Sequence, residues 1–224
     1  AQAADIASRA LADVAPMIAI GVTEREVRDE LEYQMRKFGA DGPSYETIVA
    51  SGPTNAALPH ARPTTRQFVE GDTVVIDVGA LVSGYHSDMT RTFVVGEPNV
   101  EQRGWYELVL ESQMAGLEAV AAGVRVSDVD RACRSVFESA GLSDLFVHGT
   151  GHGVGLDIHE EPFLGASGQT ELVAGDVVTV EPGLYRVGTG GVRIEDLVVV
   201  TSEGHRNLTT HPKDSPCLPS RRTT

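Results

Sequence analysis

Four carboxylates in this sequence stand beside apolar, β-branched runs, where charged groups are costly. Asp77 ends such a run in TVVIDVG, and Asp88 lies eleven residues later in HSDMTRTF. Glu181 ends a similar run in VVTVEPG, and Glu195 lies in the next apolar segment, RIEDLVVV. Buried carboxylates lose their hydration, and two that face each other repel unless a positive charge lies between them. Each acid alone could cap a turn or form a salt bridge, as Glu195 could with Arg193, but together the four predict bound cations.

A segment rich in histidine and glycine, VHGTGHGVGLDIHEEP, lies between the two acidic pairs. It holds three of the seven histidines of the chain, His148, His152 and His159. Glycine at this density removes side chains, so the backbone can pass close to a ligand. One imidazole with four carboxylates suits two divalent cations that share bridging oxygens. The alternative is a surface loop with incidental histidines, and the acids on either side favour the metal site.

Two repeated blocks of sequence would position these residues. Residues 21–39 match residues 123–141 at an offset of 123 − 21 = 102, and residues 70–79 match residues 174–183 at an offset of 174 − 70 = 104. The first block of each repeat predicts a helix, and the second predicts a strand that ends in a carboxylate and is followed by a turn and another strand. Two matched blocks at nearly equal offsets indicate two similar α+β halves rather than coincidence.

The predicted helices have recognisable starts, faces and ends. Capping-box patterns occur at Thr23-x-x-Glu26 and Ser127-x-x-Asp130. Apolar residues at helical spacing are Val27, Leu31 and Met35 in the first half, and Val129, Cys133 and Val136 in the second. Gly39 and Gly141 would end these two helices. Further helices are expected near residues 1–13 and 105–121.

Composition limits the classes of function. The chain has 224 residues, 41% of them hydrophobic, and a formal charge of −14, which disfavours nucleic acid and anionic membranes as partners. Its two lone cysteines suggest a reducing compartment, and we expect a cytoplasmic protein. The first residue is not Met, which suggests a segment of a longer protein. No zinc-protease helix, nucleotide-binding loop or serine-hydrolase elbow is present.

The residues quoted above resemble those of the pita-bread metallopeptidases, the group of methionine aminopeptidase, Xaa-Pro aminopeptidase and prolidase. The motifs are VVIDVG, HSDMTRT, HGTGHGVGL, VTVEPG and RIED, and the resemblance extends from about Gly21 to Thr209. It is strongest to the Xaa-Pro branch, because His148 precedes His152 by four residues, as it does there. The resemblance implies an α+β pita-bread fold of two pseudo-symmetric halves, with a curved, mainly antiparallel sheet and helices on its outer face.

The resemblance also implies roles for single residues. Asp77 would bind one metal, His152 and Glu181 the other, and Asp88 and Glu195 both. Two divalent ions are expected, manganese or cobalt in preference to zinc or iron, and a hydroxide that bridges them would hydrolyse Xaa-Pro bonds in peptides or dipeptides. Glu181 would act as general base and acid. The residues expected to contact substrate, or to orient a ligand, are His60, His148, His159 and Arg193.

The resemblance further implies an extent for the domain. Residues 1–209 would form one catalytic domain, with halves at about 1–99 and 104–209, followed by a flexible tail over 210–224. The N-terminal domain usual in the family is missing from this sequence, and the full-length protein is expected to be a homodimer that acts on proline-containing peptides.

One departure from the family bears on the substrate. Prolidases tend to place an arginine between the third histidine and the glutamate ligand, to hold the free carboxylate of a dipeptide. Residues 160–180 contain no Arg or Lys. Strict dipeptidase activity would therefore need Arg62, Arg193 or a partner subunit to supply the cation. Methionine aminopeptidase-like activity, a metal-free amidinohydrolase and a non-catalytic peptide-binding module are the alternative functions.

Overall fold

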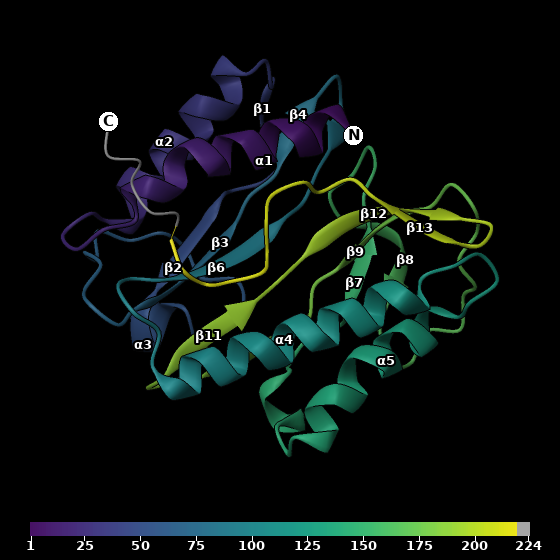
Figure 1. Ribbon diagram of the computed structural model, residues 1–224. Coiled ribbons are helices and arrows are strands. Elements are labelled where there is room, and N and C mark those ends of the chain that lie inside the picture. Colours follow the sequence, from purple (N-terminus) through teal and green to yellow (C-terminus); the bar gives the residue numbers. More distant parts are fainter. Residues whose placement is uncertain (219–224) are drawn as a thin grey trace.

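A computed structural model describes residues 1–218, which form two groups of helices and strands that follow each other along the chain (Figure 1). The α-helices are α1 (Gln2–Val14), α2 (Glu24–Lys37), α3 (Gly52–Asn55), α4 (Val100–Ala119) and α5 (Val126–Ser139), and short 3-10 helices are η1 (Ala15–Met17) and η2 (Ser143–Leu145). The strands of the first half are β1 (Gly42–Pro43), β2 (Ile48–Ser51), β3 (Thr73–Asp77), β4 (Ala80–Val82), β5 (Tyr85–His86) and β6 (Thr90–Val94). Those of the second half are β7 (Gly151–Gly153), β8 (Glu160–Leu164), β9 (Val177–Val180), β10 (Gly183–Arg186), β11 (Gly190–Arg193), β12 (Asp196–Thr201) and β13 (Gly204–Asn207).

The first half packs α1 and α2 beside an antiparallel sheet in which β3 lies between β2 and β6. Helix α2 starts with the predicted capping box, because the Thr23 hydroxyl accepts from the Glu26 N–H and the Glu26 carboxylate accepts from the Thr23 N–H. Its predicted apolar face, Val27, Leu31 and Met35, is fully buried in a core shared with α1 and β3. The capping box and the buried apolar face that the sequence predicted for α2 are confirmed.

The second half packs α4 and α5 against each other and beside the sheet β13-β12-β9-β7-β8. The predicted capping box of α5 is wrong, because the helix begins earlier, after Arg125, and no side chain caps it. Asp130 is instead buried, where its carboxylate accepts from Arg134 at 2.6 Å and from the Thr150 hydroxyl at 2.9 Å. Two hydrogen bonds to the buried Asp130 carboxylate stabilise it more than a capping bond made in solvent would.

Two details of the helices differ from the sequence pattern. Phe137 rather than Val136 completes the buried face of α5, since it lies four residues after Cys133 and so on the same side. The helix expected near residues 105–121 begins at Val100, because Asn99 and Gln102 form a capping box there. Glycines end α2 and α5 as predicted, with φ of +100° at Gly39 and +70° at Gly141.

The two halves match strand for strand and bring their acids to equivalent places. Strands β2, β3 and β6 correspond to β7, β9 and β12, with the central strand antiparallel to both neighbours in each half. Asp77 ends β3 and Glu181 follows β9, whereas Asp88 precedes β6 and Glu195 precedes β12. A hydrogen bond of 3.1 Å from the Glu195 N–H to the Thr90 carbonyl joins the halves at this point. The predicted two-half α+β architecture is confirmed.

Residues 210–218, the described part of the segment predicted as a flexible tail over 210–224, make contacts with the domain. Main-chain carbonyls of His211, Lys213 and Pro216 accept hydrogen bonds from side chains or backbone of the domain. A composition rich in Pro, Ser, Thr and Arg without periodicity therefore did not reveal these contacts, which also include the Lys213 ammonium with Asp196 and Leu218 against the core of the first half. Residues 219–224 lie outside the described part of the chain.

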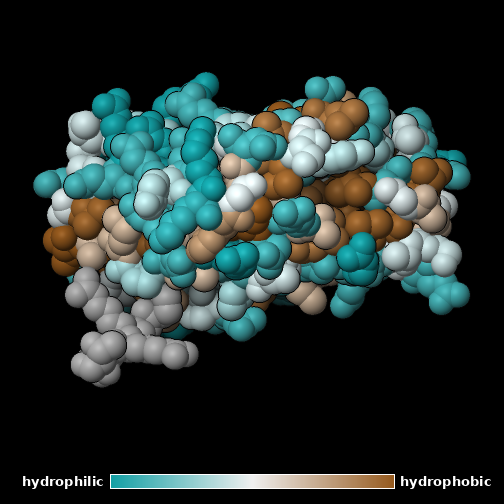
Figure 2. Space-filling model, turned by 90° about the horizontal axis from the view of Figure 1, so that it is seen from above, coloured by the Kyte–Doolittle hydropathy of each residue, from teal (hydrophilic) through white to brown (hydrophobic). Residues whose placement is uncertain are grey.

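The surface is mixed in character. Figure 2 shows hydrophobic side chains mainly in the middle and right of the face seen from above, and a smaller group at its left edge, among hydrophilic residues. Within residues 1–218, no helix combines the length and the apolar character that crossing a bilayer requires.

Candidate metal centre

The acids of the first half share one hydroxyl donor. The Tyr45 hydroxyl, contributed by the loop before β2, hydrogen-bonds to the carboxylates of both Asp77 and Asp88. Asp77 also accepts from the Arg193 guanidinium at 2.7 Å. Burial and the two carboxylates raise the pKa of Tyr45 well above its usual value, so its phenol keeps the proton that it donates. These contacts hold both carboxylates toward a common cavity.

The acids of the second half are held by threonines. The Thr179 hydroxyl lies 3.1 Å from Glu181 Oε1, and the Thr90 hydroxyl donates to Glu195 Oε2 at 2.7 Å. Glu195 is 1% exposed, and within the described residues its Oε1 is buried without a hydrogen-bond partner. A buried carboxylate oxygen without a donor is costly unless a cation completes its surroundings. This orphaned oxygen is the first indication that the site fits a metal.

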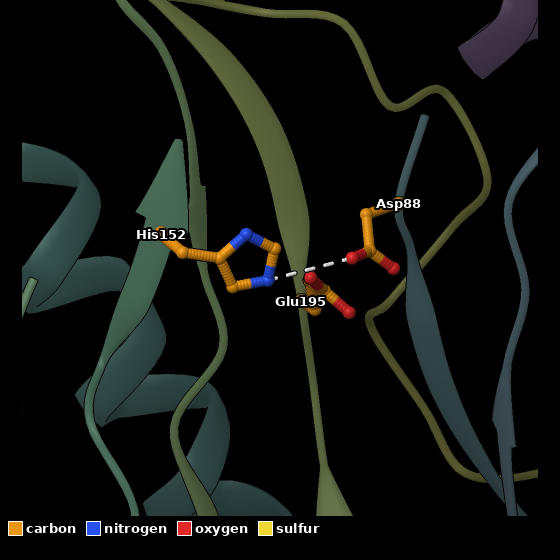
Figure 3. Close-up of side chains that lie close together, drawn as sticks. All are labelled: Asp88, His152 and Glu195. Atoms are coloured by element: carbon orange, nitrogen blue, oxygen red, sulfur yellow. Dashed lines mark ion pairs between the residues drawn. The ribbon is translucent and has the colours of Figure 1, made fainter. Parts of the chain in front are cut away.

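His152 faces the acids across the cavity (Figure 3). Its Nε2 lies 3.4 Å from Glu181 Oε1 and 3.6 Å from Asp88 Oδ2, and its Nδ1 lies 3.0 Å from the Gly153 carbonyl. The carbonyl requires the proton on Nδ1, which leaves the Nε2 lone pair among carboxylate oxygens. One ligand atom each from Asp88, His152 and Glu195 lies within 4.8 Å of the others. The atoms that face one another here are an imidazole nitrogen with a free lone pair and carboxylate oxygens. A divalent cation binds to such lone pairs.

Glycines on both sides of His152 allow its strand to lie between two others. A β-carbon at Gly151 would lie 2.0 Å from the Thr179 carbonyl oxygen, and one at Gly153 would lie 2.4 Å from the Glu161 carbonyl oxygen. The glycines therefore serve close contact with β8 and β9, rather than the close approach to a ligand that the sequence suggested. Packing of β7 fixes the imidazole toward the cavity.

The electrostatics of the cluster also match a cation site. Burial, together with repulsion from neighbouring carboxylates, raises the pKa of Asp88 and Glu195 well above their usual range. Burial raises the pKa of Glu181 to about 7 and lowers that of His152 to about 4. Keeping these acids charged therefore costs free energy in the protein alone, and a bound cation would offset that cost.

A cavity of about 580 Å³ gives access to the cluster. It is lined by Asp77, Asp88, His152 and Glu181 and by the predicted substrate-side histidines His60, His148 and His159. The His159 ring packs against His152, with ring centroids 4.4 Å apart. Burial and the Arg193 charge lower the pKa of His60, which keeps this imidazole neutral. The structure therefore brings all the predicted side chains to one place, with Arg193 and Glu195 buried behind the cavity wall.

Both ring nitrogens of His148, which was predicted to donate to substrate, have partners within the protein. Its Nδ1 lies 2.8 Å from the Gly149 carbonyl, and its Nε2 lies 2.9 Å from the Tyr185 hydroxyl. Burial lowers the pKa of His148 to about 3, so the ring is neutral and both nitrogens are used inside the protein. Tyr185 in turn accepts from Arg193 at 2.9 Å. His148 therefore supports Arg193 through Tyr185 and has no N–H left for a ligand.

Arg193 does not form the salt bridge with Glu195 that the sequence left open. Its guanidinium donates to Asp77, Tyr185, the Thr90 hydroxyl and the Pro59 carbonyl. Glu195 shares only the Thr90 hydroxyl with it. The arginine donates to a candidate ligand of the other half, a contact that its expected orienting role requires.

Tyr45 was missed by the sequence analysis, because a lone tyrosine in SYETIVAS carries no spacing signal. We predict that Tyr45→Phe weakens Mn²⁺ binding by roughly 10- to 100-fold, since both Asp77 and Asp88 lose the hydroxyl that orients them. Calorimetric titration of the metal-free protein measures this. Tyr33→Phe, at an exposed position on α2, is the matched control. Equal Mn²⁺ affinity in Tyr45→Phe and in the control would contradict an orienting role.

Comparison with known proteins gives the same picture. The model of metallopeptidase family M24 matches residues 1–202. A Xaa-Pro dipeptidase of Pyrococcus furiosus is 45% identical over 208 residues, which cover 93% of this chain and 60% of that protein. Among solved structures, a Xaa-Pro dipeptidase from Bacillus anthracis has a TM-score of 0.94 at 45% identity, covering 96% of this chain and 61% of the other. A Thermotoga maritima X-Pro aminopeptidase has a TM-score of 0.93 at 39% identity, covering 96% and 60%.

This chain thus spans about 60% of the length of these relatives. The likeness extends over both halves and confirms the predicted pita-bread fold and the predicted family. From the matched family model and the identity to these relatives, the chain belongs to metallopeptidase family M24.

Proposed function

We propose that this chain is the catalytic part of a dinuclear-metal peptidase that hydrolyses Xaa-Pro bonds at the N-terminus of peptides or in dipeptides. The observation that carries the proposal is the convergence of acceptors from both halves, with a Glu195 oxygen buried and unpartnered in the described structure. The unit we propose is residues 1–209, with halves at about 1–99 and 104–209. Similarity to a Xaa-Pro dipeptidase and to an X-Pro aminopeptidase supports the substrate class.

Five side chains would hold the metals. Asp77 would bind one ion, His152 and Glu181 the other, and Asp88 and Glu195 both. When bound, two such cations supply Lewis-acid activation of a peptide carbonyl and of water. A site with mostly oxygen ligands favours manganese or cobalt over zinc or iron.

The protein groups that face the cavity supply the remaining chemistry. Glu181 lines the cavity whereas Glu195 does not, so Glu181 is the carboxylate of that half that can take a proton from water and return it to the leaving nitrogen. His60 and His159 line the same cavity and would donate hydrogen bonds to the substrate. Arg193 holds Asp77 in place from behind.

Activity measured with and without metal tests the proposal. We predict that treatment with chelator abolishes hydrolysis of a Xaa-Pro substrate and that Mn²⁺ or Co²⁺ restores it, because no protein group in the cluster can replace the cations. Xaa-Pro dipeptides, longer Xaa-Pro peptides and Met-Ala peptides should be compared in one assay. Cleavage of the Met-Ala peptide alone would indicate methionine aminopeptidase-like activity. Full activity in chelator, or tight peptide binding without any cleavage, would reject the proposal.

Two wider properties remain predictions. A cytoplasmic location and a homodimer of the full-length protein are both expected, and sedimentation analysis of the full-length protein measures the second.

A further inference from the structure

The cavity contains one side chain with a permanent positive charge. Among the described residues that line it, Arg62 alone is an arginine or lysine. It follows His60 by two residues, and His60 lines the same cavity and is expected to contact the substrate. A short peptide brings a negative terminal carboxylate into such a cavity, one residue, or about 3.5 Å, beyond the bond that is cleaved. Among the described lining residues, Arg62 is the one with a permanent positive charge to meet it.

The other candidate cation is already used. Arg193 is 2% exposed, lies behind the cavity wall, and donates to four protein groups, as described above. A substrate carboxylate could reach it only by displacing Asp77 or Tyr185. Of the two arginines that the sequence left open for this role, the geometry leaves Arg62.

Arg62 is held by an acid that a substrate could replace. It forms an ion pair with Glu46, which also lines the cavity and directly follows Tyr45. The two side chains are 69% and 50% exposed, so the pair is solvated and weak. A guanidinium binds any carboxylate with the same fork geometry, and exchanging one partner for another costs little.

We infer that Arg62 is a specificity-determining residue that binds the terminal carboxylate of a short Xaa-Pro substrate, and that Glu46 competes with the substrate for it. The inference rests on the proposed function for the identity of the substrate. It makes the cavity selective for short peptides with a free carboxylate over amides, without the arginine that prolidases tend to place between the third histidine and the glutamate ligand.

The test compares a free acid with its amide. We predict that Arg62→Gln lowers the ratio of kcat/KM for a Xaa-Pro dipeptide to that for its C-terminal amide about tenfold, because only the acid loses a charged hydrogen bond. Glu46→Gln raises the same ratio by roughly two- to fivefold, because the competitor is neutralised. Arg62→Lys keeps the charge and recovers part of the ratio. The matched control is Arg131→Gln, from an exposed pair with Asp128 outside the cavity, and it leaves the ratio unchanged.

A binding measurement separates this inference from the proposed function. Proline, the leaving product, and prolinamide are titrated into the Mn²⁺-loaded protein by NMR, which needs no turnover. Preference for proline that is lost in Arg62→Gln supports the inference even if no peptide is cleaved. A ratio and a proline preference that are the same in wild type and Arg62→Gln overturn it, since the carboxylate would then be bound elsewhere, for example by the metals. If the Xaa-Pro dipeptide and its amide are both cleaved while Arg62→Gln behaves like wild type, the inference is rejected and the proposed function is retained.

Discussion

Asp88→Asn is expected to lower kcat/KM for a Xaa-Pro peptide by roughly a thousandfold, because an oxygen expected to bridge both metals is lost. The same change should raise the melting temperature of the metal-free protein. Burial and the neighbouring carboxylates oppose the charge of Asp88, and the neutral amide removes that repulsion while its oxygen can still accept from Tyr45. Addition of Mn²⁺ should then stabilise wild type far more than Asp88→Asn. Thermal unfolding with and without Mn²⁺ measures both effects.

The opposite signs of these two effects make the test of Asp88 specific. A substitution that merely damages the fold lowers stability in both conditions. Asp13→Asn, at an exposed position on α1, removes the same charge away from the site and should change neither value. If Mn²⁺ raised the melting temperature of Asp88→Asn as much as that of wild type, Asp88 could not be a metal ligand.

Local signals in the sequence predicted most of the fold. The capping box at Thr23 and Glu26, the buried face of α2 and the glycine at its end depend on residues within one or two turns, and all three are confirmed. The cap of α5 was predicted from the same kind of pattern and is wrong. Asp130 accepts from Thr150, twenty residues away in the sequence, and such a contact leaves no local trace.

The four acids could be predicted because each has a visible cost or repeat, whereas His152 was indicated by the glycine-rich histidine segment and by the family resemblance. A carboxylate at the end of an apolar strand pattern needs a partner, and the second half repeats the first at nearly the same offset. The groups that hold these side chains have neither property. Tyr45 and Thr90 meet their carboxylates only through tertiary contacts, and the Thr90 hydroxyl bonds a residue 105 positions away.

The same reasoning applies to the hydrogen bonds of His148. Its spacing from His152 places it in the cavity wall, as predicted, but the sequence does not tell which hydrogen bonds its nitrogens make. Tyr185 takes one of them, and it does so because the pairing of β10 with β11 places its hydroxyl next to Arg193. The place of His148 in the cavity wall followed the pattern, whereas the partners of its nitrogens depend on tertiary contacts.

Arg193→Lys tests whether this network acts on the metal site or only on stability. An ammonium can reach one or two of the four groups that the guanidinium binds, so the Asp77 carboxylate should lose its fixed orientation. We expect Mn²⁺ affinity and kcat to fall by roughly 10- to 100-fold. The free energy of unfolding should fall by about 2–4 kcal/mol, somewhat less than the loss of a whole buried partner. Metal titration, steady-state kinetics and denaturant unfolding measure these quantities.

Arg91 provides a closely matched control for this change. Both arginines are 2% exposed, and each pairs with an aspartate, at 2.7 Å for Arg193 with Asp77 and at 2.8 Å for Arg91 with Asp196. Within the described residues Arg91 contacts no side chain that is expected to bind metal, and it reaches Glu195 only at the main-chain carbonyl, at 2.6 Å. Arg91→Lys should therefore lose similar stability but much less Mn²⁺ affinity than Arg193→Lys. If both variants lost stability and Mn²⁺ affinity in the same proportion, Arg193 would be a structural residue. A loss of Mn²⁺ affinity confined to Arg193→Lys would show that the buried network behind the cavity sets the position of Asp77.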